Sequence, residues 1–160
     1  MTASLPTLPE PPPASTEATR AVMRANSRSD TRPETALRSE LHRNGLRYRV
    51  GSRPDPSLNC RADIVFSAVR VAVFVDGCFW HRCPEHGVRP RTNSDYWDAK
   101  IARNVARDRR NDAALTRTGW TVVRVWEHES PEEAGERISQ LVRERRAPRP
   151  GRPSTSGPRG

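Results

Sequence analysis

Residue types that commonly bind metals gather in one short stretch near the middle of the chain. Two cysteines and two histidines lie close together there, as Cys78, His81, Cys83 and His86. Four residues separate Cys78 from Cys83, and two separate Cys83 from His86, with a proline between these two ligands. This spacing is typical of a zinc-binding knuckle, in which thiolates and imidazoles surround one ion.

A short apolar run ends immediately before this stretch. Residues 71–75 contain no polar side chain and are rich in β-branched residues, which predicts a strand buried on both faces and ended by Gly77. Asp76 lies at the end of this strand, and Asp63 lies two residues into the preceding predicted strand. Two carboxylates on adjacent strand ends can hold Mg²⁺ and a water molecule, which suits hydrolysis of a phosphodiester.

The other predicted elements follow from periodicity and turn residues. A cap at Asp30 or Thr31 followed by Pro33 predicts a helix that ends near Asn44, at Gly45. Strands are predicted over 46–50, 61–66, 69–75 and 120–126, the second and third forming a hairpin. Helices are predicted over 96–118, capped by Ser94 or Asp95, and from Pro131 onward. This order predicts an α/β domain with a mixed sheet.

The ends of the chain differ from its middle in composition. Residues 1–20 are rich in proline and residues 143–160 in arginine and proline, which predicts a disordered tail on each side of a domain at 21–142. The formal net charge is +9, and every basic residue except Lys100 is arginine. Arginine binds phosphate in a bidentate manner and stacks on bases, so this balance favours a nucleic-acid partner.

The composition also excludes some classes of protein. Three cysteines do not make a disulfide framework, and the sequence has no apolar stretch long enough for a membrane span or a signal peptide. We therefore expect a cytoplasmic protein with no membrane partner. The sequence carries no sign of a dimer interface, so we expect a monomer.

The central motif is part of a wider resemblance to a known protein family. Gly-Cys-Phe-Trp-His at 77–81, with parts of 63–66, 73–76, 83–86, 96–108 and 119–128, resembles the very-short-patch repair (Vsr) DNA mismatch endonucleases. The resemblance covers roughly residues 21–142. It implies a restriction-endonuclease-like mixed β-sheet flanked by helices, with a structural zinc knuckle. The implied activity is Mg²⁺-dependent nicking of one strand, 5′ to the T of a T:G mismatch that arises by deamination of 5-methylcytosine.

The resemblance also assigns catalytic roles. Asp63 matches the catalytic aspartate that binds Mg²⁺, and the backbone carbonyl of Val75 falls where the family supplies another ligand to that ion. His81 matches the catalytic histidine, a general base or acid. Glu34 matches an acid that hydrogen-bonds a water molecule on the metal.

One position departs from the family. The best-studied members have Thr-His where this chain has Val75-Asp76, so Asp76 is either a second metal ligand or a residue that positions water. The related PD-(D/E)xK nucleases carry a lysine two residues after an acid on this strand. Cys78 stands in that place here, which excludes a lysine base and leaves His81 for that role.

The zinc set that we favour is Cys78, Cys83, His86 and His128. Two thiolates and two imidazoles make a closed tetrahedral structural site. Because His128 follows the last predicted strand, the ion would tie the knuckle to that strand. The alternative for His128 is an ordinary surface histidine.

Aromatic residues flank the predicted catalytic histidine. Phe79, Trp80 and Trp97 are core residues in the usual case. The resemblance instead implies that they insert into the base stack beside the mismatch. Met23, on the segment before the first helix, matches a methionine that intercalates from the opposite groove.

Two other functions remain open from the sequence. A non-catalytic zinc-containing DNA-binding domain would keep the four zinc ligands but would not need Asp63, Glu34 and His81. A restriction-type endonuclease would cut both strands of ordinary duplex and would have no use for an aromatic wedge. Double-stranded DNA is the expected partner in every case.

Overall fold

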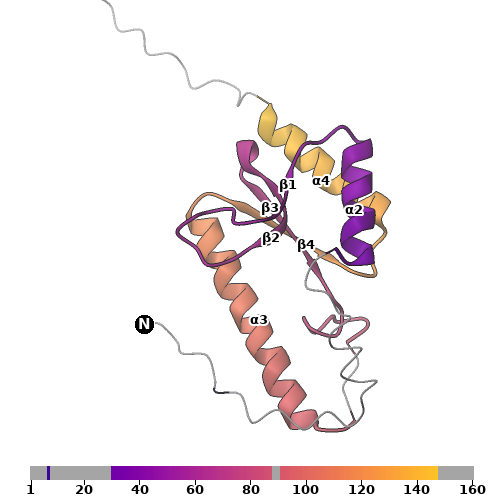
Figure 1. Cartoon of the computed structure of the whole chain (residues 1–160), viewed down its shortest axis with the longest axis vertical. Helices are drawn as coiled ribbons and strands as arrows, with labels where there is room; N and C mark the ends of the chain where they lie inside the picture. Colours follow the sequence, from indigo (N-terminus) through magenta and orange to yellow (C-terminus); the bar gives the residue numbers. More distant parts are fainter. Residues whose placement is uncertain (1–6, 8–29, 88–90, 148–160) are drawn as a thin grey trace, which may run out of the picture.

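The computed structural model of the chain describes residue 7 and residues 30–87 and 91–147. Within these ranges the chain forms one four-stranded sheet with helices on both faces (Figure 1). The elements, in chain order, are α2 (Arg32–Arg43), β1 (Arg49–Ser52), β2 (Ala62–Phe66), the 3₁₀ turn η1 (Ser67–Val69), β3 (Val71–Asp76), α3 (Ser94–Arg117), β4 (Thr121–Trp126) and α4 (Pro131–Arg146).

The sheet is mixed, with the strand order β1-β2-β3-β4. β1 pairs antiparallel with β2, and β2 with β3, so these three strands form a meander. η1 and a left-handed Arg70 (φ 53°) make the turn of the β2–β3 hairpin. β3 and β4 are parallel, with Asp76 opposite Trp126. The carboxyl ends of β3 and β4 therefore meet at one edge of the sheet.

Each face of the sheet packs on its own helices. Leu37 and Leu41 of α2 and Ile138 of α4 are buried with the β-branched residues of one face. α2 and α4 pack closely there, since a Cβ at Gly135 would lie 2.5 Å from the Glu40 side chain. On the other face, Leu115 of α3 packs on Ala62, Ala72 and Phe74. α3 extends beyond the sheet toward the knuckle (Figure 1).

Most of the predicted elements are confirmed, and the differences have local causes. The strand predicted over 46–50 is displaced, because Leu46 donates its N–H to the carbonyl of Leu41 and packs in the core. With Gly45 at φ 78°, this bond forms a Schellman motif that uses residue 46 to end α2. β1 begins only at Arg49. The cap of α3 is Asn93 instead of Ser94 or Asp95.

The structure bears on one of the two predicted domain limits. α4 continues through Arg146, so the helix runs past the limit predicted at residue 142. The boundary predicted near residue 20 lies outside the described residues. Among the helices that the structure describes, none has both the length and the apolar character that crossing a membrane requires.

Candidate active site and metal centre

Acidic side chains gather at the sheet edge where β3 ends. Asp63 of β2 lies beside β3, and its Oδ2 accepts the N–H of Val75 at 2.7 Å. Burial, with the nearby carboxylates of Glu34 and Asp76, raises the pKa of Asp63 to about 6, although the Val75 bond opposes this. A carboxylate that is desolvated among other acids favours a bound cation. This oxygen-rich site therefore fits a hard divalent ion.

Glu34 reaches this cluster from the first turn of α2. It is only 8% exposed, which is unusual for a glutamate. Its Oε2 accepts the N–H of Asp30, at 2.9 Å. The structure thus brings Glu34, Asp63 and Asp76 together at one end of the sheet.

His81 lies between two acids. Its Nδ1 is 2.5 Å from Oδ2 of Asp108 on α3 and 3.7 Å from Oδ1 of Asp76. Burial opposes the ionisation of Asp108, but His81, Arg124 and Arg107 outweigh it and lower the pKa of Asp108. An ionised carboxylate only accepts hydrogen bonds, so Nδ1 carries the proton in this pair. The other ring nitrogen, Nε2, is then the proton acceptor of a neutral His81.

Arg124 of β4 completes the acidic cluster. It donates from Nη1 to both oxygens of Asp76, at 2.8 and 2.9 Å, and from Nε and Nη2 to Asp112, at 2.9 and 2.7 Å. Burial raises the pKa of Asp76, against the opposing effects of His81 and Arg124. Sequence reasoning gave no role to Arg124, Asp108 or Asp112. The available signals were an arginine inside an apolar strand and two acids four residues apart on a helix.

The four predicted zinc ligands also come together. Nδ1 of His128 is 3.0 Å from Sγ of Cys78 and 3.7 Å from Sγ of Cys83, and Nδ1 of His86 is 4.0 Å from Sγ of Cys83. One donor atom from each of the four lies within 4.8 Å of the others. Donors at tetrahedral zinc are roughly 3.3–3.8 Å apart, given bonds of about 2.0–2.3 Å. The arrangement therefore fits one ion with sulfur and nitrogen ligands.

Hydrogen bonds fix this knuckle to the sheet. Glu127 accepts the N–H of Cys78 at 2.7 Å, and its own N–H donates to the carbonyl of Asp76 at 2.9 Å. Nε2 of His128 lies 3.5 Å from a carboxylate oxygen of Glu85, which can orient the ring toward the sulfurs. Burial, together with Cys83 and Glu127, raises the pKa of Cys78 to about 11. The Cys78 thiol thus needs a cation beside it to become a thiolate at neutral pH.

The predicted wedge residues form an aromatic cluster beside the acidic one. Phe79, Trp80 and Trp97 contact one another edge to face, with ring centroids 4.9–5.8 Å apart. All three are half-buried and belong to neither core cluster. Nζ of Lys100 lies 5.3 Å from both indole centroids, so its charge faces the same surface. Met23 lies outside the described residues.

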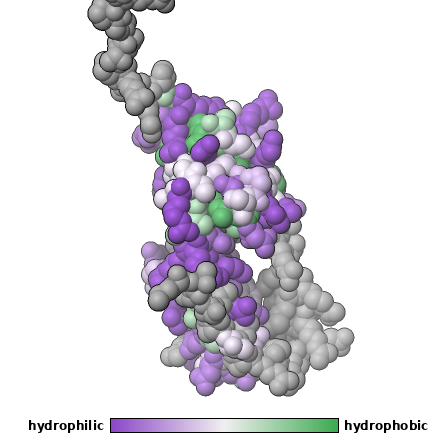
Figure 2. All heavy atoms as spheres, turned by 90° about the vertical axis from the view of Figure 1, so that its left-hand side faces the viewer, coloured by the Kyte–Doolittle hydropathy of each residue, from purple (hydrophilic) through white to green (hydrophobic). Residues whose placement is uncertain are grey.

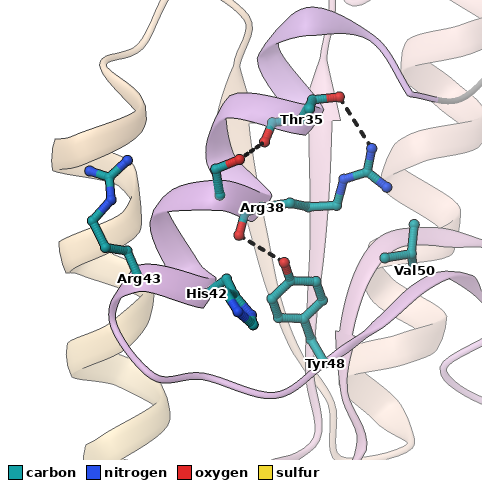
Figure 3. Close-up of a pocket in the computed structure, with 7 residues that line it drawn as sticks. Thr35, Arg38, His42, Arg43, Tyr48 and Val50 are labelled. Carbon is teal, nitrogen blue, oxygen red and sulfur yellow. Dashed lines mark hydrogen bonds between the residues drawn. The ribbon is translucent and has the colours of Figure 1, made fainter.

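Two hollows differ in their relation to these clusters. A pocket of about 380 Å³ opens beside His81 and is bordered by Arg82 and Arg109, whose charges suit a phosphate backbone. A larger hollow of about 590 Å³ lies between α2 and β1 (Figure 3). There Tyr48 donates to the carbonyl of Arg38, and Arg38 pairs with Asp30. No predicted site residue lines that hollow.

The side of the molecule that Figure 2 shows has a strongly hydrophilic surface. In Figure 2 hydrophilic side chains predominate, and apolar ones form only small separate patches. α3 contributes exposed arginines at 107, 109, 110 and 117. Such a surface suits contact with a phosphate backbone better than contact with an apolar partner.

Comparison with known proteins places the chain among DNA-cutting enzymes. The family model described as DNA mismatch endonuclease Vsr matches residues 14–85. The chain is 54% identical over 114 residues to the Type II nicking enzyme V.NaeI of Lentzea aerocolonigenes, covering 70% of this chain and 69% of that protein. It is 44% identical over 119 residues to the Type II nicking enzyme V.XorIIP of Xanthomonas oryzae pv. oryzae, covering 72% and 83%.

A further relative carries the family's own name. The DNA mismatch endonuclease Vsr of Escherichia coli is 43% identical over 107 residues, which is 66% of each chain. This chain therefore belongs to the Vsr DNA mismatch endonuclease family, and it is a DNA endonuclease.

Proposed function

We propose that the protein nicks one strand of double-stranded DNA on the 5′ side of the T in a T:G mismatch, such as deamination of 5-methylcytosine produces. The observation that carries this proposal is the continuity of Phe79, Trp80 and His81. Two stacking side chains and a histidine held by Asp108 follow one another in the chain. A base step opened by the aromatic rings would therefore lie next to the hydrolytic group.

Mg²⁺ is the ion that we assign to the acidic cluster. Asp63 and the backbone carbonyl of Val75 would hold it, and Glu34 would hydrogen-bond its water. All of these donors are oxygen atoms, which magnesium prefers, and the raised pKa of Asp63 favours a cation beside it. When bound, the ion neutralises charge on the phosphate and acidifies water.

His81 is the proton acceptor in this scheme. Because Asp108 holds Nδ1, Nε2 takes a proton from the attacking water. The water oxygen bonds to phosphorus while the bond from phosphorus to the 3′ oxygen breaks and that oxygen gains a proton. The products are a 3′-hydroxyl and a 5′-phosphate. Asp76, tied to Arg124, positions His81 or the water.

Zn²⁺ is the ion that we assign to Cys78, Cys83, His86 and His128. Their donor types and spacing suit a closed structural site. By joining the knuckle to the end of β4, the ion would fix the segment that carries Phe79, Trp80 and His81. The knuckle thus belongs to a restriction-endonuclease-like fold in this proposal.

The aromatic cluster would select the mismatch. A wobble pair stacks poorly, so opening it costs less than opening a matched step, by a few kcal/mol at most. Phe79, Trp80 and Trp97 would replace the lost stacking, and Met23 would enter from the opposite groove. With one hydrolytic site in a monomer, only one strand lies within reach.

The remaining assignments are proposals of the same kind. We place the folded domain of a cytoplasmic protein at about residues 21–142, with α4 extending it to Arg146. The tails predicted at 1–20 and 143–160 lie mostly outside the described residues. Membership of an endonuclease family argues against a non-catalytic zinc-containing DNA-binding domain. The restriction-type alternative differs in its substrate.

A substrate comparison tests this function. Duplexes that differ only in one central T:G, T:A or C:G pair, within flanking sequences that include cytosine-methylation sites, are incubated with excess enzyme and Mg²⁺. We expect rapid nicking of the T-containing strand of the T:G duplex and an intact complementary strand. Phe79→Ala with Trp80→Ala should lower this preference more than it lowers affinity for DNA. Equal cleavage of all three duplexes would favour the restriction-type alternative.

A further inference from the structure

One cation is already present in the acidic cluster. The guanidinium of Arg124 faces three carboxylates, those of Asp76, Asp112 and Asp108; the third lies 3.8 Å from Nη1. Cζ lies 4.7 Å from the centroid of the Phe74 ring, which supports the guanidinium from one side. Its side chain is only 24% exposed. Arg124 is therefore a fixed charge of the site and not a mobile surface residue.

All three of its nitrogens donate to two acids. Nη1 serves both oxygens of Asp76, while Nε and Nη2 serve both oxygens of Asp112. Bidentate pairs of this kind are among the stronger hydrogen-bonded pairs in proteins. They hold Asp76 in one orientation, with Oδ1 3.7 Å from Nδ1 of His81.

Asp63 and Asp76 differ in whether a positively charged side chain pairs with them. Among the described residues, the structure gives Asp63 one hydrogen bond, from the Val75 amide, and no ion pair. Asp76 has its positive partner at 2.8 Å. The donors of Asp76, His81 and Asp108 lie close enough together to hold a metal. A divalent ion there would, however, meet the Arg124 charge at close range, which repels it.

We propose that Arg124 takes the place of a second metal ion in this site. The centre then binds one divalent ion, at Asp63, and Asp76 is a positioning residue for His81 instead of a ligand. This inference rests on the proposed Mg²⁺ site at Asp63. It makes Arg124 the residue that keeps the second half of the centre free of metal.

Counting bound Mn²⁺ tests the proposal without measuring cleavage. The full chain, saturated with zinc, is titrated with Mn²⁺ and free ion is followed by electron paramagnetic resonance. We expect about one tight Mn²⁺ per chain in the unsubstituted protein. Asp76→Asn should leave that number unchanged, and Asp63→Asn should remove it.

Variants of Arg124 provide the second arm. Arg124→Gln should raise the number to about two, because Asp76 and Asp112 then lose the cation that pairs with both of them. Adding Asp76→Asn to Arg124→Gln should return it to about one. Arg124→Lys, which keeps the charge, should also stay at one. Arg107→Gln is the matched control, since Arg107 is exposed and 3.6 Å from Asp108.

The outcomes separate the two proposals. Two ions in the unsubstituted protein, one of them lost in Asp76→Asn, would overturn the inference even if every Arg124 variant failed to fold. A folded Arg124→Gln variant that still binds one ion would also overturn it. Retention of the ion in Asp63→Asn would instead contradict the proposed Mg²⁺ site, and with it the function.

Discussion

Two groups of ligating side chains meet at the end of β3, and they balance their charge differently. The cysteine–histidine cluster (Cys78, Cys83, His86 and His128) contains two thiols and no arginine or lysine. The acidic cluster around Asp76 includes Arg124 within hydrogen-bonding distance. In the proposed function, the first arrangement takes its positive charge from a bound zinc ion. The second supplies part of its positive charge from the chain.

This contrast separates the expected effects of metal removal. Loss of the proposed zinc ion would remove one of the links between the knuckle and the end of β4, beside the Glu127–Cys78 hydrogen bond, so it should affect folding. Loss of an ion from Asp63 leaves the Arg124 pairs in place, so it should affect chemistry and leave the fold intact. Four substitutions examine this division.

The largest effect is expected at the knuckle. Cys83→Ser should lose zinc and several kcal/mol of unfolding free energy, because the ion's binding energy contributes to folding. Metal analysis of the purified protein, together with thermal unfolding, measures both. Cys60→Ser is the control, since Cys60 is buried but lies outside the cluster. Freshly purified protein without zinc would contradict the ligand assignment.

Removal of the Asp63 carboxylate should abolish the reaction and spare the structure. Asp63→Ala should lower the single-turnover rate of nicking by at least about 10³-fold, because the metal is no longer held. Binding to DNA, measured by fluorescence anisotropy, should change little. Asp55→Ala, in the exposed loop before β2, should behave like the unsubstituted protein. Near-normal turnover of Asp63→Ala in Mg²⁺ would remove Asp63 from the catalytic role.

Asp108 should matter less than Asp63. Asp108→Asn keeps the shape of the side chain but loses the charge that orients His81 through Nδ1, so we expect a fall of about 10²-fold in the rate constant. Affinity for DNA should be unchanged. Asp98→Asn, ten residues earlier on α3, is the control. An unaltered rate would mean that the His81–Asp108 contact has no role in proton transfer.

The last expected effect is a gain in stability. The pKa of Asp63 is raised from 3.8 to about 6, so the folded state binds more protons than the unfolded state between these values. Without metal, this group therefore lowers the free energy of unfolding as the pH rises from about 4 to about 6. Asp63→Asn should stabilise the metal-free protein at pH 7.5 by up to about 3 kcal/mol and have little effect near pH 4.

Urea unfolding in a metal chelator that spares the zinc would measure this difference at both pH values. Asp55→Asn is the control with the opposite sign, because hydrogen bonds from Ser57 lower the pKa of Asp55. A destabilised Asp63→Asn variant at pH 7.5 would contradict the account of a desolvated carboxylate. It would leave the assignment of zinc untouched.

The same two clusters show how far the sequence could be interpreted. Three of the four cysteine–histidine ligands lie within one short segment, so their spacing alone predicted a shared site. The strand that precedes His128 was predicted from its alternating pattern, which is rich in β-branched residues. The strand positions of Asp63 and Asp76 were likewise predictable, because apolar runs surround both residues.

The rest of the acidic cluster depends on the path of α3. Asp108 and Asp112 are one turn apart on α3, and no role was predicted for either of them. They face the sheet edge because α3 packs through Leu115 onto the face that carries Phe74 and Asp76. Arg124 was overlooked because its partners come from two distant elements. Local periodicity contains no information on such tertiary pairs.

The parallel pairing of β3 with β4 also has a kinetic consequence. Val71 pairs with Thr121, so closing this ladder requires the chain to pass through the whole knuckle and all of α3 first. Contacts between such distant segments form slowly, because the entropy of a long loop is lost before they stabilise the chain. His128 and Arg124 both arrive with β4. During refolding, His128 would therefore join the proposed zinc site in the same step that assembles the acidic cluster. A metal-sensitive dye could follow the binding of zinc in that step.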